Sequence, residues 1–234
     1  ASDVYKRQVT DYIRVLDRSG YFETVTLSED DLKRNDMYRA NAQRAKAQSR
    51  FADYHDYLLS LEMTAEIGDF SPLYLQRITQ LTNKSNQFNL TTKRYTAEQM
   101  EAVYNSDEYI RLYGKLYDKF GDNGVVAVTI GKTDSEDKGR LDIELWLMSC
   151  RVLKRDMELA MLDSLVEQAK KRGIREIYGH YYPTAKNKMV AGLYESFGFE
   201  KISQDEDGNT AWRLLVEGYE DKNTVIKVKE EHYA

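Results

Sequence analysis

Cys150 is the only cysteine of this 234-residue chain, and Arg151 follows it directly. The neighbouring cation would favour the thiolate, which is the nucleophilic form of cysteine and can carry an acyl group as a thioester. His180 lies at the end of the next predicted strand, where it could face Cys150 and act as its base. A free cysteine is more often buried, and a lone strand histidine more often only packs. We therefore expect Cys150 in the core, with a catalytic Cys150 and His180 as the alternative.

A dense polar run at 82–89 offers a second group of candidates, because it holds four amides and a lysine. Such a density is poor for core packing and suits the fixing of loops or the binding of a polar group. Asn86 and Asn89 can end the preceding helix and bond loop backbone. Alternatively, Lys84, Asn86 and Gln87 can line the substrate side of a cleft. The structural interpretation is slightly favoured.

Asn187 opens a predicted helix, and its side chain can cap that helix or contact a ligand. Thr184 and Lys186 lie just ahead of it, where a hydroxyl and a cation would support an anion at the helix end. The two interpretations are compatible.

Composition limits the class of protein. The formal charge is -5, hydrophobic residues make up 41% of the chain, and there are only 2 prolines and 13 glycines. This predicts a globular chain with a packed core and gives no general electrostatic reason to bind nucleic acid. One cysteine cannot form an internal disulfide, and no apolar run approaches the length of a membrane span. We expect a cytoplasmic protein whose partners are small molecules and proteins, with no nucleic acid, no membrane and no metal site.

The elements that must position these residues follow from hydrophobic periodicity and capping signals. Residues 1–8 look like a non-native leader, so we leave them out of the fold and expect the natural protein to extend further toward its N-terminus. We place a module boundary near residue 65, after a helical first part that includes a strand at 21–27 and a long polar helix at 30–49. In the second part, the same signals predict helices at 72–89, 96–105 and 156–172 and a short helix opened by Asn187. Strands are predicted at 110–120, 125–130, 141–148, 174–182, 200–204 and 210–216.

The order of these elements, ααβββαβαββ, and the motif at 187–199 (NKMVAGLYESFGF) resemble the GNAT acyltransferases. The implied fold is α/β (α+β), with a mixed, mainly antiparallel sheet flanked by helices. The resemblance places Tyr194 at the tyrosine position, where a phenol can protonate a departing thiolate. The alternative is a tyrosine that only packs. Because 18 tyrosines occur in this chain, the position alone selects Tyr194.

The same resemblance implies a donor site. In GNAT enzymes a splayed strand accepts the pantetheine amide hydrogen bonds, and a glycine-containing turn at the next helix N-terminus binds pyrophosphate. The corresponding turn here is 151–156, whose cofactor-binding candidates are Arg151, Lys154 and Arg155, together with Asn187. Lys154 and Asp156 replace the glycines, and their side chains would hinder a close approach of phosphate. No tightly bound cofactor is expected. The donor would be acyl-CoA or, more readily, a phosphopantetheine thioester on a carrier protein.

Residues 80–95 (QLTNKSNQFNLTTKRY), 118–124, 147–153 and 183–187 carry a closer resemblance, to FkbH-like proteins. That family joins a HAD-type phosphatase-like domain to a GNAT-like domain and is associated with glyceryl transfer onto acyl carrier proteins. The resemblance implies that 9–64 is the tail of a HAD-type domain plus connecting helices and that 65–234 is GNAT-like. The HAD-type catalytic site would lie upstream. The run Asp205-Glu-Asp207 does not supply it, because turn chemistry and polar flanks indicate a hairpin.

The leading hypothesis is therefore a GNAT-like acyltransferase that moves an acyl group, such as glyceryl, between thioesters or to a small-molecule or carrier-protein acceptor. The first alternative is a degenerate GNAT fold that docks a carrier protein or the upstream HAD-type domain. The second is a phosphatase fragment that is inactive alone.

Overall fold

The computed structural model describes residues 34–230, so the predicted leader at 1–8 and the elements expected at 9–30 lie outside the described residues. The chain divides into two compact units, Ala1–Gln43 and Arg44–Ala234, and helix α3 (Arg34–Gln48) begins in the first and ends in the second. The rest of the described structure belongs to the second unit. The predicted module boundary near residue 65 stays a prediction.

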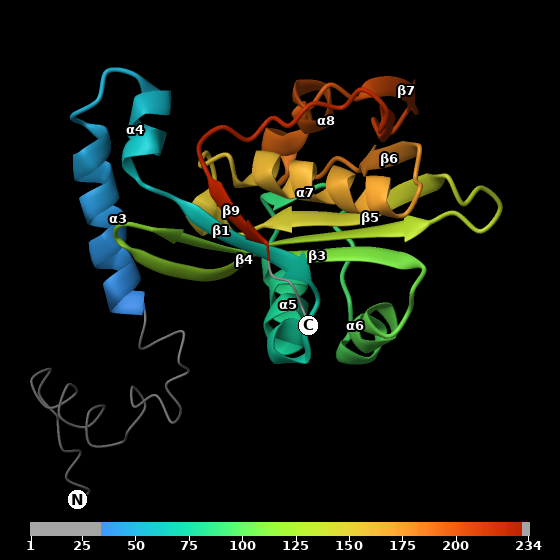
Figure 1. The fold of residues 1–234 in the computed structure, drawn as a ribbon, viewed down its shortest axis with the longest axis horizontal. Helices are drawn as coiled ribbons and strands as arrows, with labels where there is room; N and C mark the ends of the chain where they lie inside the picture. Colours follow the sequence, from blue (N-terminus) through green and yellow to red (C-terminus); the bar gives the residue numbers. More distant parts are fainter. Residues whose placement is uncertain (1–33, 231–234) are drawn as a thin grey trace, which may run out of the picture. The chain divides into compact units, whose positions relative to one another are not determined.

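The second unit is built on a 9-stranded sheet in the order β7-β8-β6-β5-β4-β3-β1-β9, with β2 paired to β5 (Figure 1). Only the β5–β6 and β1–β9 pairs are parallel. The predicted fold class, a mixed and mainly antiparallel sheet flanked by helices, is confirmed. The strands are β1 (Thr64–Asp69), β2 (Phe88–Asn89), β3 (Tyr109–Asp118), β4 (Gly121–Thr133), β5 (Arg140–Met148), β6 (Glu176–Tyr181), β7 (Glu200–Gln204), β8 (Thr210–Leu215) and β9 (Lys227–Glu230).

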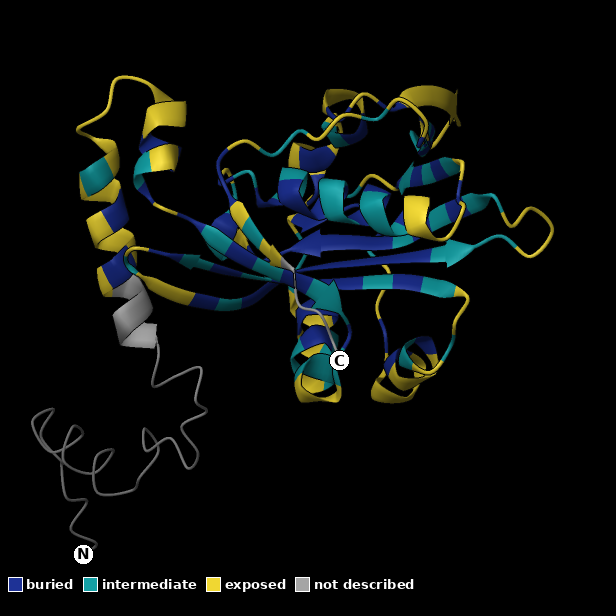
Figure 2. Cartoon of the chain, viewed as in Figure 1, coloured by how far each residue is buried: buried dark blue, intermediate teal, exposed yellow. Residues whose placement is uncertain are grey.

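Helices cover the sheet from both sides. Figure 1 shows α7 (Met157–Lys171) and α8 (Leu193–Ser196) over one face, and α5 (Pro72–Lys84) and α6 (Ala97–Tyr104) over the other. Two hydrophobic clusters fill these layers, one containing the α7 and α8 side chains and the other those of α5 and α6. The central strands are accordingly buried, while the outer helix surfaces and the loop after β4 are exposed (Figure 2). A short helix, α4 (Tyr54–Ser60), precedes β1.

Local sequence signals explain the helix limits. Thr96 and Gln99 form the predicted capping box at the start of α6. Gly173, with φ +71°, follows the end of α7 in the left-handed conformation that glycine tolerates. The order of elements needs three corrections. Strand β1 precedes the helices, strand β9 follows the last predicted strand, and the helix predicted over 72–89 ends at Lys84. Residues 88 and 89 form β2 instead, since tertiary pairing overrides their helical spacing.

The helix predicted from Asn187 is also shorter than expected. A 3₁₀ turn, η2 (Lys188–Val190), comes first, and α8 begins only at Leu193. This irregular path places Tyr194 and Phe199 in ring contact, with their centroids 4.9 Å apart.

Candidate active site

Strands β5 and β6 separate along their length. They pair in parallel only where Arg140, Leu141 and Asp142 face Glu176, Ile177 and Tyr178. Beyond Asp142 the pairing of β5 with β4 shifts register between Ile130 and Gly131, as at a β-bulge. A bulge bends and twists a strand locally. The two strands therefore diverge beyond Asp142. We use the word groove for this gap in their pairing, whose closed end lies at Asp142 and whose walls are the rest of β5 and β6.

The chain's own segment 88–90 lies in this groove. Phe88 and Asn89 pair antiparallel with Met148 and Leu147 of β5. Leu90 then bridges both walls, because its N–H donates to the Trp146 carbonyl at 3.1 Å and its carbonyl accepts from the Tyr182 N–H at 2.9 Å. All three residues of the segment are at most 4% exposed.

Asn187 fastens this segment from the β6 side. Its Nδ2 donates to the carbonyls of Asn89 and Tyr182, both at 2.9 Å. Its Oδ1 accepts from the backbone N–H of Thr184 at 2.7 Å and from the Thr184 hydroxyl at 3.0 Å. The prediction that this side chain caps its helix is wrong, since it makes no capping hydrogen bond. Asn187 is fully buried, with its amide committed to the chain itself.

Tyr194 packs against the same wall. It is fully buried, and a Cβ added at Gly179 of β6 would lie 2.3 Å from the Tyr194 ring. Its ring also meets Trp146 of β5 edge-on, with centroids 6.3 Å apart. The phenol oxygen has no hydrogen-bond partner, and burial raises the pKa of Tyr194. These surroundings favour the packing alternative for Tyr194 over the predicted general-acid role.

The exchange Tyr194→Phe is expected to leave acyl transfer unchanged and stability within about 1 kcal/mol of the parent. The ring contacts are kept, and the hydroxyl removed is a buried group without a partner. Transfer rates and denaturant midpoints of the two proteins measure this. Tyr182→Phe, at an exposed tyrosine of the same region, is the matched control. A rate that falls for Tyr194→Phe alone would restore the general-acid role.

The turn before α7 keeps the shape of a glycine turn without its glycines. Lys154 and Asp156 have φ of +63° and +59°, in the left-handed region that glycine adopts freely. Each costs about 1–2 kcal/mol of backbone strain. The Lys154 carbonyl accepts a hydrogen bond from the Tyr54 hydroxyl of α4 at 2.6 Å. The Lys154 side chain is exposed, whereas Asp156 is partly buried at the helix N-terminus.

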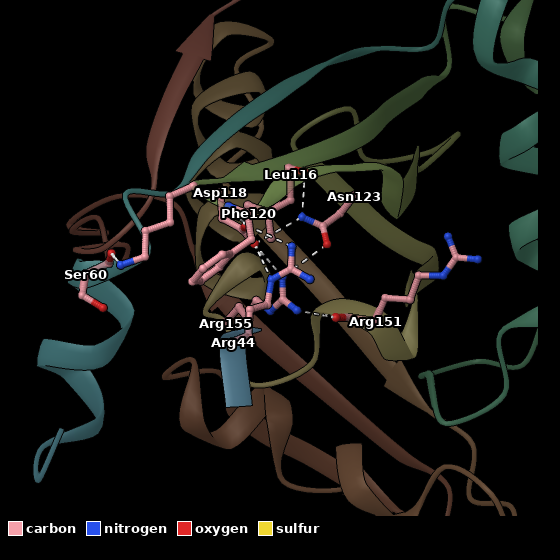
Figure 3. A network of polar contacts seen from close by, with 9 residues as sticks. Arg44, Ser60, Leu116, Asp118, Phe120, Asn123, Arg151 and Arg155 are labelled. Carbon is pink, nitrogen blue, oxygen red and sulfur yellow. Dashed lines mark hydrogen bonds and ion pairs between the residues drawn. The ribbon is translucent and has the colours of Figure 1, made fainter. Parts of the chain in front are cut away.

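Arg155, a predicted phosphate ligand, is turned into the protein (Figure 3). Its guanidinium is 3.1 Å from Asp118 Oδ2 and donates to the Arg151 carbonyl at 2.9 Å. Arg44 completes the cluster with bonds of 2.8 and 2.9 Å to both oxygens of Asp118. Burial and the neighbouring Arg44 lower the pKa of Arg155. Figure 3 shows the Arg151 side chain pointing away from this cluster, so only Arg151 and Lys154 of the predicted cations remain outward.

Carboxylates take the place of an anion site at this helix end. Burial raises the pKa of Glu158 to about 7, and the nearby Asp156 adds to the rise. Burial likewise raises the pKa of Asp156, against the effect of His55. The Oε2 atom of Glu158 is buried and has no hydrogen-bond partner. Asp156 at the N-cap and Glu158 in the first turn of α7 would repel a phosphate, although the helix dipole itself attracts anions.

Glu158→Gln should remove a pH-dependent loss of stability. Because the folded pKa lies above the unfolded value of 4.5, the native state binds this proton more tightly. That contribution is complete below pH 4.5 and is lost as the pH rises to about 7, which costs roughly 2–3 kcal/mol. The variant should therefore exceed the parent in stability at pH 8 by about this amount. Denaturant midpoints across the range measure it, with Glu167→Gln as the exposed control on α7. If the stability of the parent and of Glu158→Gln changed with pH in the same way, the prediction would be contradicted.

Cys150 and His180 are not brought together. Cys150 is exposed, so the expectation that it lies in the core is wrong. It starts the 3₁₀ turn η1 (Cys150–Val152), because β5 ends at Met148 and the thiol falls outside the sheet. His180 instead lies at the closed end of the groove, with Nε2 3.3 Å from Asp142 Oδ1. The strand from Asp142 to Met148 alone spans roughly 20 Å, and Cys150 lies beyond its end.

Asp142 and His180 form a polar pair that periodicity alone did not single out. Arg140 holds Asp142 through two hydrogen bonds of 2.8 and 2.6 Å, and its guanidinium lies 3.9 Å from the centre of the Tyr178 ring. Although burial opposes it, the hydrogen bonds from His180 and Arg140 lower the pKa of Asp142. Tyr182 stacks beside the His180 ring at 6.3 Å. Two charged residues, Asp142 and Glu144, in the otherwise apolar strand 141–148 were the available signal.

The remaining predicted residues lie around this groove. Asn89 Oδ1 accepts from the Thr92 N–H at 2.9 Å and so bonds loop backbone, as the structural interpretation of this run expects. Asn86 Oδ1 instead accepts from the Arg94 side chain at 2.6 Å. Lys84, at the last turn of α5, and Gln87, just before β2, are exposed, as is Lys186 beside Asn187. Their substrate-binding roles stay predictions. Within residues 34–230, no three His, Cys, Asp or Glu side chains are grouped as a metal ion requires, and no helix could cross a membrane.

Solved structures with a similar arrangement include acetyltransferases. The chain is similar to the ribosomal-protein-S18-alanine N-acetyltransferase from Escherichia coli, with 14% identity, 69% of this chain and 99% of that chain covered, and a TM-score of 0.50. It is also similar to the GNAT domain of S. lividans PAT, with 15% identity, 64% and 89% covered, and a TM-score of 0.50. The fold is that of the GNAT acetyltransferases. No protein-family model and no curated protein matches the sequence.

A third similar structure, yncA from Salmonella typhimurium, contains its cofactor acetyl-CoA, with 14% identity, 68% and 96% covered, and a TM-score of 0.50. The acetyl-CoA of that protein gives a donor against which the corresponding region of this chain can be compared. The residues of this chain do not fit that donor. Carboxylates occupy the phosphate turn, Arg155 is bound to Asp118, and segment 88–90 fills the groove between β5 and β6.

Proposed function

We propose that this chain is the GNAT-like part of an FkbH-like protein and that it transfers an acyl group, such as glyceryl, from a thioester other than acyl-CoA. The observation that carries the proposal is the Asp142–His180 pair, placed at the closed end of the β5–β6 groove in a GNAT fold. Acyl-carrier-protein thioesters are the donor class that best agrees with a turn unsuited to pyrophosphate. The upstream HAD-type domain would be the second partner. The lone cysteine agrees with a reducing cytoplasm.

The pair can supply general-base chemistry. Asp142 accepts a hydrogen bond from His180 Nε2, which fixes the ring and leaves Nδ1 for an acceptor hydroxyl, amine or thiol. His180 would take the acceptor proton while the acceptor atom attacks the thioester carbonyl. The carbon–sulfur bond then breaks, and the proton passes to the departing thiolate. Side chains on the same side, such as Lys93 with its 2.5 Å ion pair to Glu144, would border the acceptor.

The decisive experiment gives the full chain matched donors that carry the same acyl group. Binding is measured by calorimetry and transfer by intact mass, with acyl-CoA, free pantetheine thioester and acylated carrier protein in parallel. We expect the carrier thioester to be bound and consumed and acyl-CoA to be neither. Tight binding or turnover of acyl-CoA would refute the donor assignment, and inertness toward every donor would refute the transferase.

A docking module is the second candidate, and the filled groove favours it. In that case the domain binds the carrier protein or the HAD-type part and performs no chemistry. Binding of both acylated and unacylated carrier protein with equal affinity and no turnover would identify this role.

Cys150 offers a separate covalent route, since it is exposed and adjacent to Arg151. Transfer of the acyl group from the donor sulfur to Cys150 Sγ would add the acyl mass to the chain and release the donor thiol. Mass spectrometry after incubation with donor tests this directly, with Cys150→Ser as the control. His180 cannot be its base at the separation described above.

A further inference from the structure

We infer that segment 88–90 is a permanent occupant of the groove between β5 and β6, so that no pantetheine arm enters this groove from coenzyme A or from a carrier protein. The inference rests on the proposed function for one consequence only, which is the route of the donor. A thioester would have to reach Asp142 and His180 from the sheet face that carries α5 and α6. The site is then specific for acyl groups presented at that face rather than threaded between the strands.

The hydrogen bonds supply the first argument. A pantetheine arm binds a splayed strand through its amides, as an added strand would. The Trp146 carbonyl on one wall already accepts from Leu90, and the Tyr182 N–H on the other already donates to it. Both N–H bonds of the Asn187 amide are used by Asn89 and Tyr182. An incoming arm would therefore have to break bonds that the chain satisfies internally.

Burial supplies the second argument. Phe88 and Leu90 belong to the same hydrophobic cluster as Trp146, Tyr181 and Tyr194, and Leu90 is 0% exposed. Withdrawing the segment would expose two large apolar side chains and remove one of the two acceptors of the buried Asn187 amide, the Asn89 carbonyl. Buried polar groups left without partners are strongly disfavoured.

The ends of the segment supply the third argument. On one side, helix α5 ends only a few residues earlier, at Lys84. On the other, the Thr91 hydroxyl donates to the Glu144 carbonyl at 2.7 Å, and the Thr92 N–H donates to Asn89 Oδ1. Thr92 has φ +55°, which is rare for a β-branched residue and persists only where the surroundings fix it. The segment is therefore held at both ends as well as along its length.

The face left for a donor is polar and aromatic. Asp142, Tyr178, His180 and Tyr182 are at least partly accessible there. Because Gly179 and Tyr181 alternate with them toward the buried face, the sequence of β6 separates an open side from a core side. A neutral acyl thioester could lie across the Tyr182 and His180 rings with its carbonyl near the pair.

Hydrogen exchange of the full chain tests the inference. The Leu90 and Tyr182 amides should exchange as slowly as those of central strands β4 and β5, and neither coenzyme A nor pantetheine should change them. Faster exchange at Leu90, or new protection at Trp146 and Met148 on addition of pantetheine, would overturn it. This readout does not depend on turnover, so an inactive protein with a protected Leu90 would refute the proposed function alone.

Asn187→Ala provides the matched variant. Loss of its two hydrogen bonds should speed exchange at Leu90 and Tyr182 roughly 10- to 100-fold, with the β3 and β4 amides unchanged. Asn209→Ala, in the exposed turn between β7 and β8, should leave Leu90 as in the parent. If Asn187→Ala does not change the exchange rate of the Leu90 amide, the Asn187 side chain does not hold the segment in the groove, and this outcome would contradict the inference. Should this variant not fold, the exchange data of the parent with and without pantetheine still decide the question.

Discussion

Replacing Asp118 by Ala is expected to destabilise the domain by about 3–5 kcal/mol, which would lower its midpoint of thermal unfolding by roughly 10 °C. The Asp118 side chain is 0% exposed and faces Arg44 and Arg155, whose side chains are 7% and 10% exposed. It also accepts the Phe120 N–H at 2.8 Å. Its removal leaves two buried guanidinium groups facing each other without the anion between them, and like charges in a poorly solvated site repel strongly.

Asp118→Asn separates charge from shape, because it keeps the volume and an acceptor for Phe120 but removes the anion. The stability of Asp118→Asn should be nearer to that of Asp118→Ala than to that of the parent. Glu167→Ala breaks an exposed pair with Lys171 and should change stability by less than about 1 kcal/mol. Guanidinium chloride midpoints measure all three. If Asp118→Ala were as mild as Glu167→Ala, the cluster would contribute little to the fold.

Replacing His180 by Ala should slow acyl transfer from the carrier thioester by about 10²–10⁴-fold, the usual contribution of a positioned general base. Stability should change little, because the side chain is 28% exposed and its only polar contact given by the structure is Asp142. The transfer rate under saturating donor, measured by intact mass, reports this effect.

Asp142→Asn tests the orientation of the histidine. It should reduce the rate less than His180→Ala and shift the pH profile of the reaction, whereas a merely structural Asp142 would alter stability and leave the profile in place. Tyr104→Phe is a suitable control, since Tyr104 belongs to α6 and its ring packs on Arg111. A full rate for His180→Ala would remove the pair from the mechanism and favour the docking role.

The fold could be predicted from the sequence wherever local signals agree with tertiary packing. The capping box at Thr96 and the glycine after α7 each report a local preference that the structure keeps. The strand at 141–148 is also found, but its predicted alternation is interrupted by the register shift, which places Ile143 in one hydrophobic cluster and Leu145 in the other. The strand at 88–89 could not be predicted this way. Its residues continue a helical pattern, and only pairing with Leu147 and Met148, which lie about 60 positions away in the chain, makes them a strand.

For the candidate site, too, some features could be predicted from the sequence and others could not. The sequence by itself determined which residue types are available, including the lone Cys150, the motif that holds Asn187 and Tyr194, and the loss of both glycines from the turn before α7. Only the tertiary structure decided what they contact. It exposed Cys150, paired His180 with Asp142, turned Arg155 onto Asp118 and placed segment 88–90 between β5 and β6. The physical reason is that burial and hydrogen bonding depend on neighbours distant in the chain, whereas sequence patterns carry only local preference.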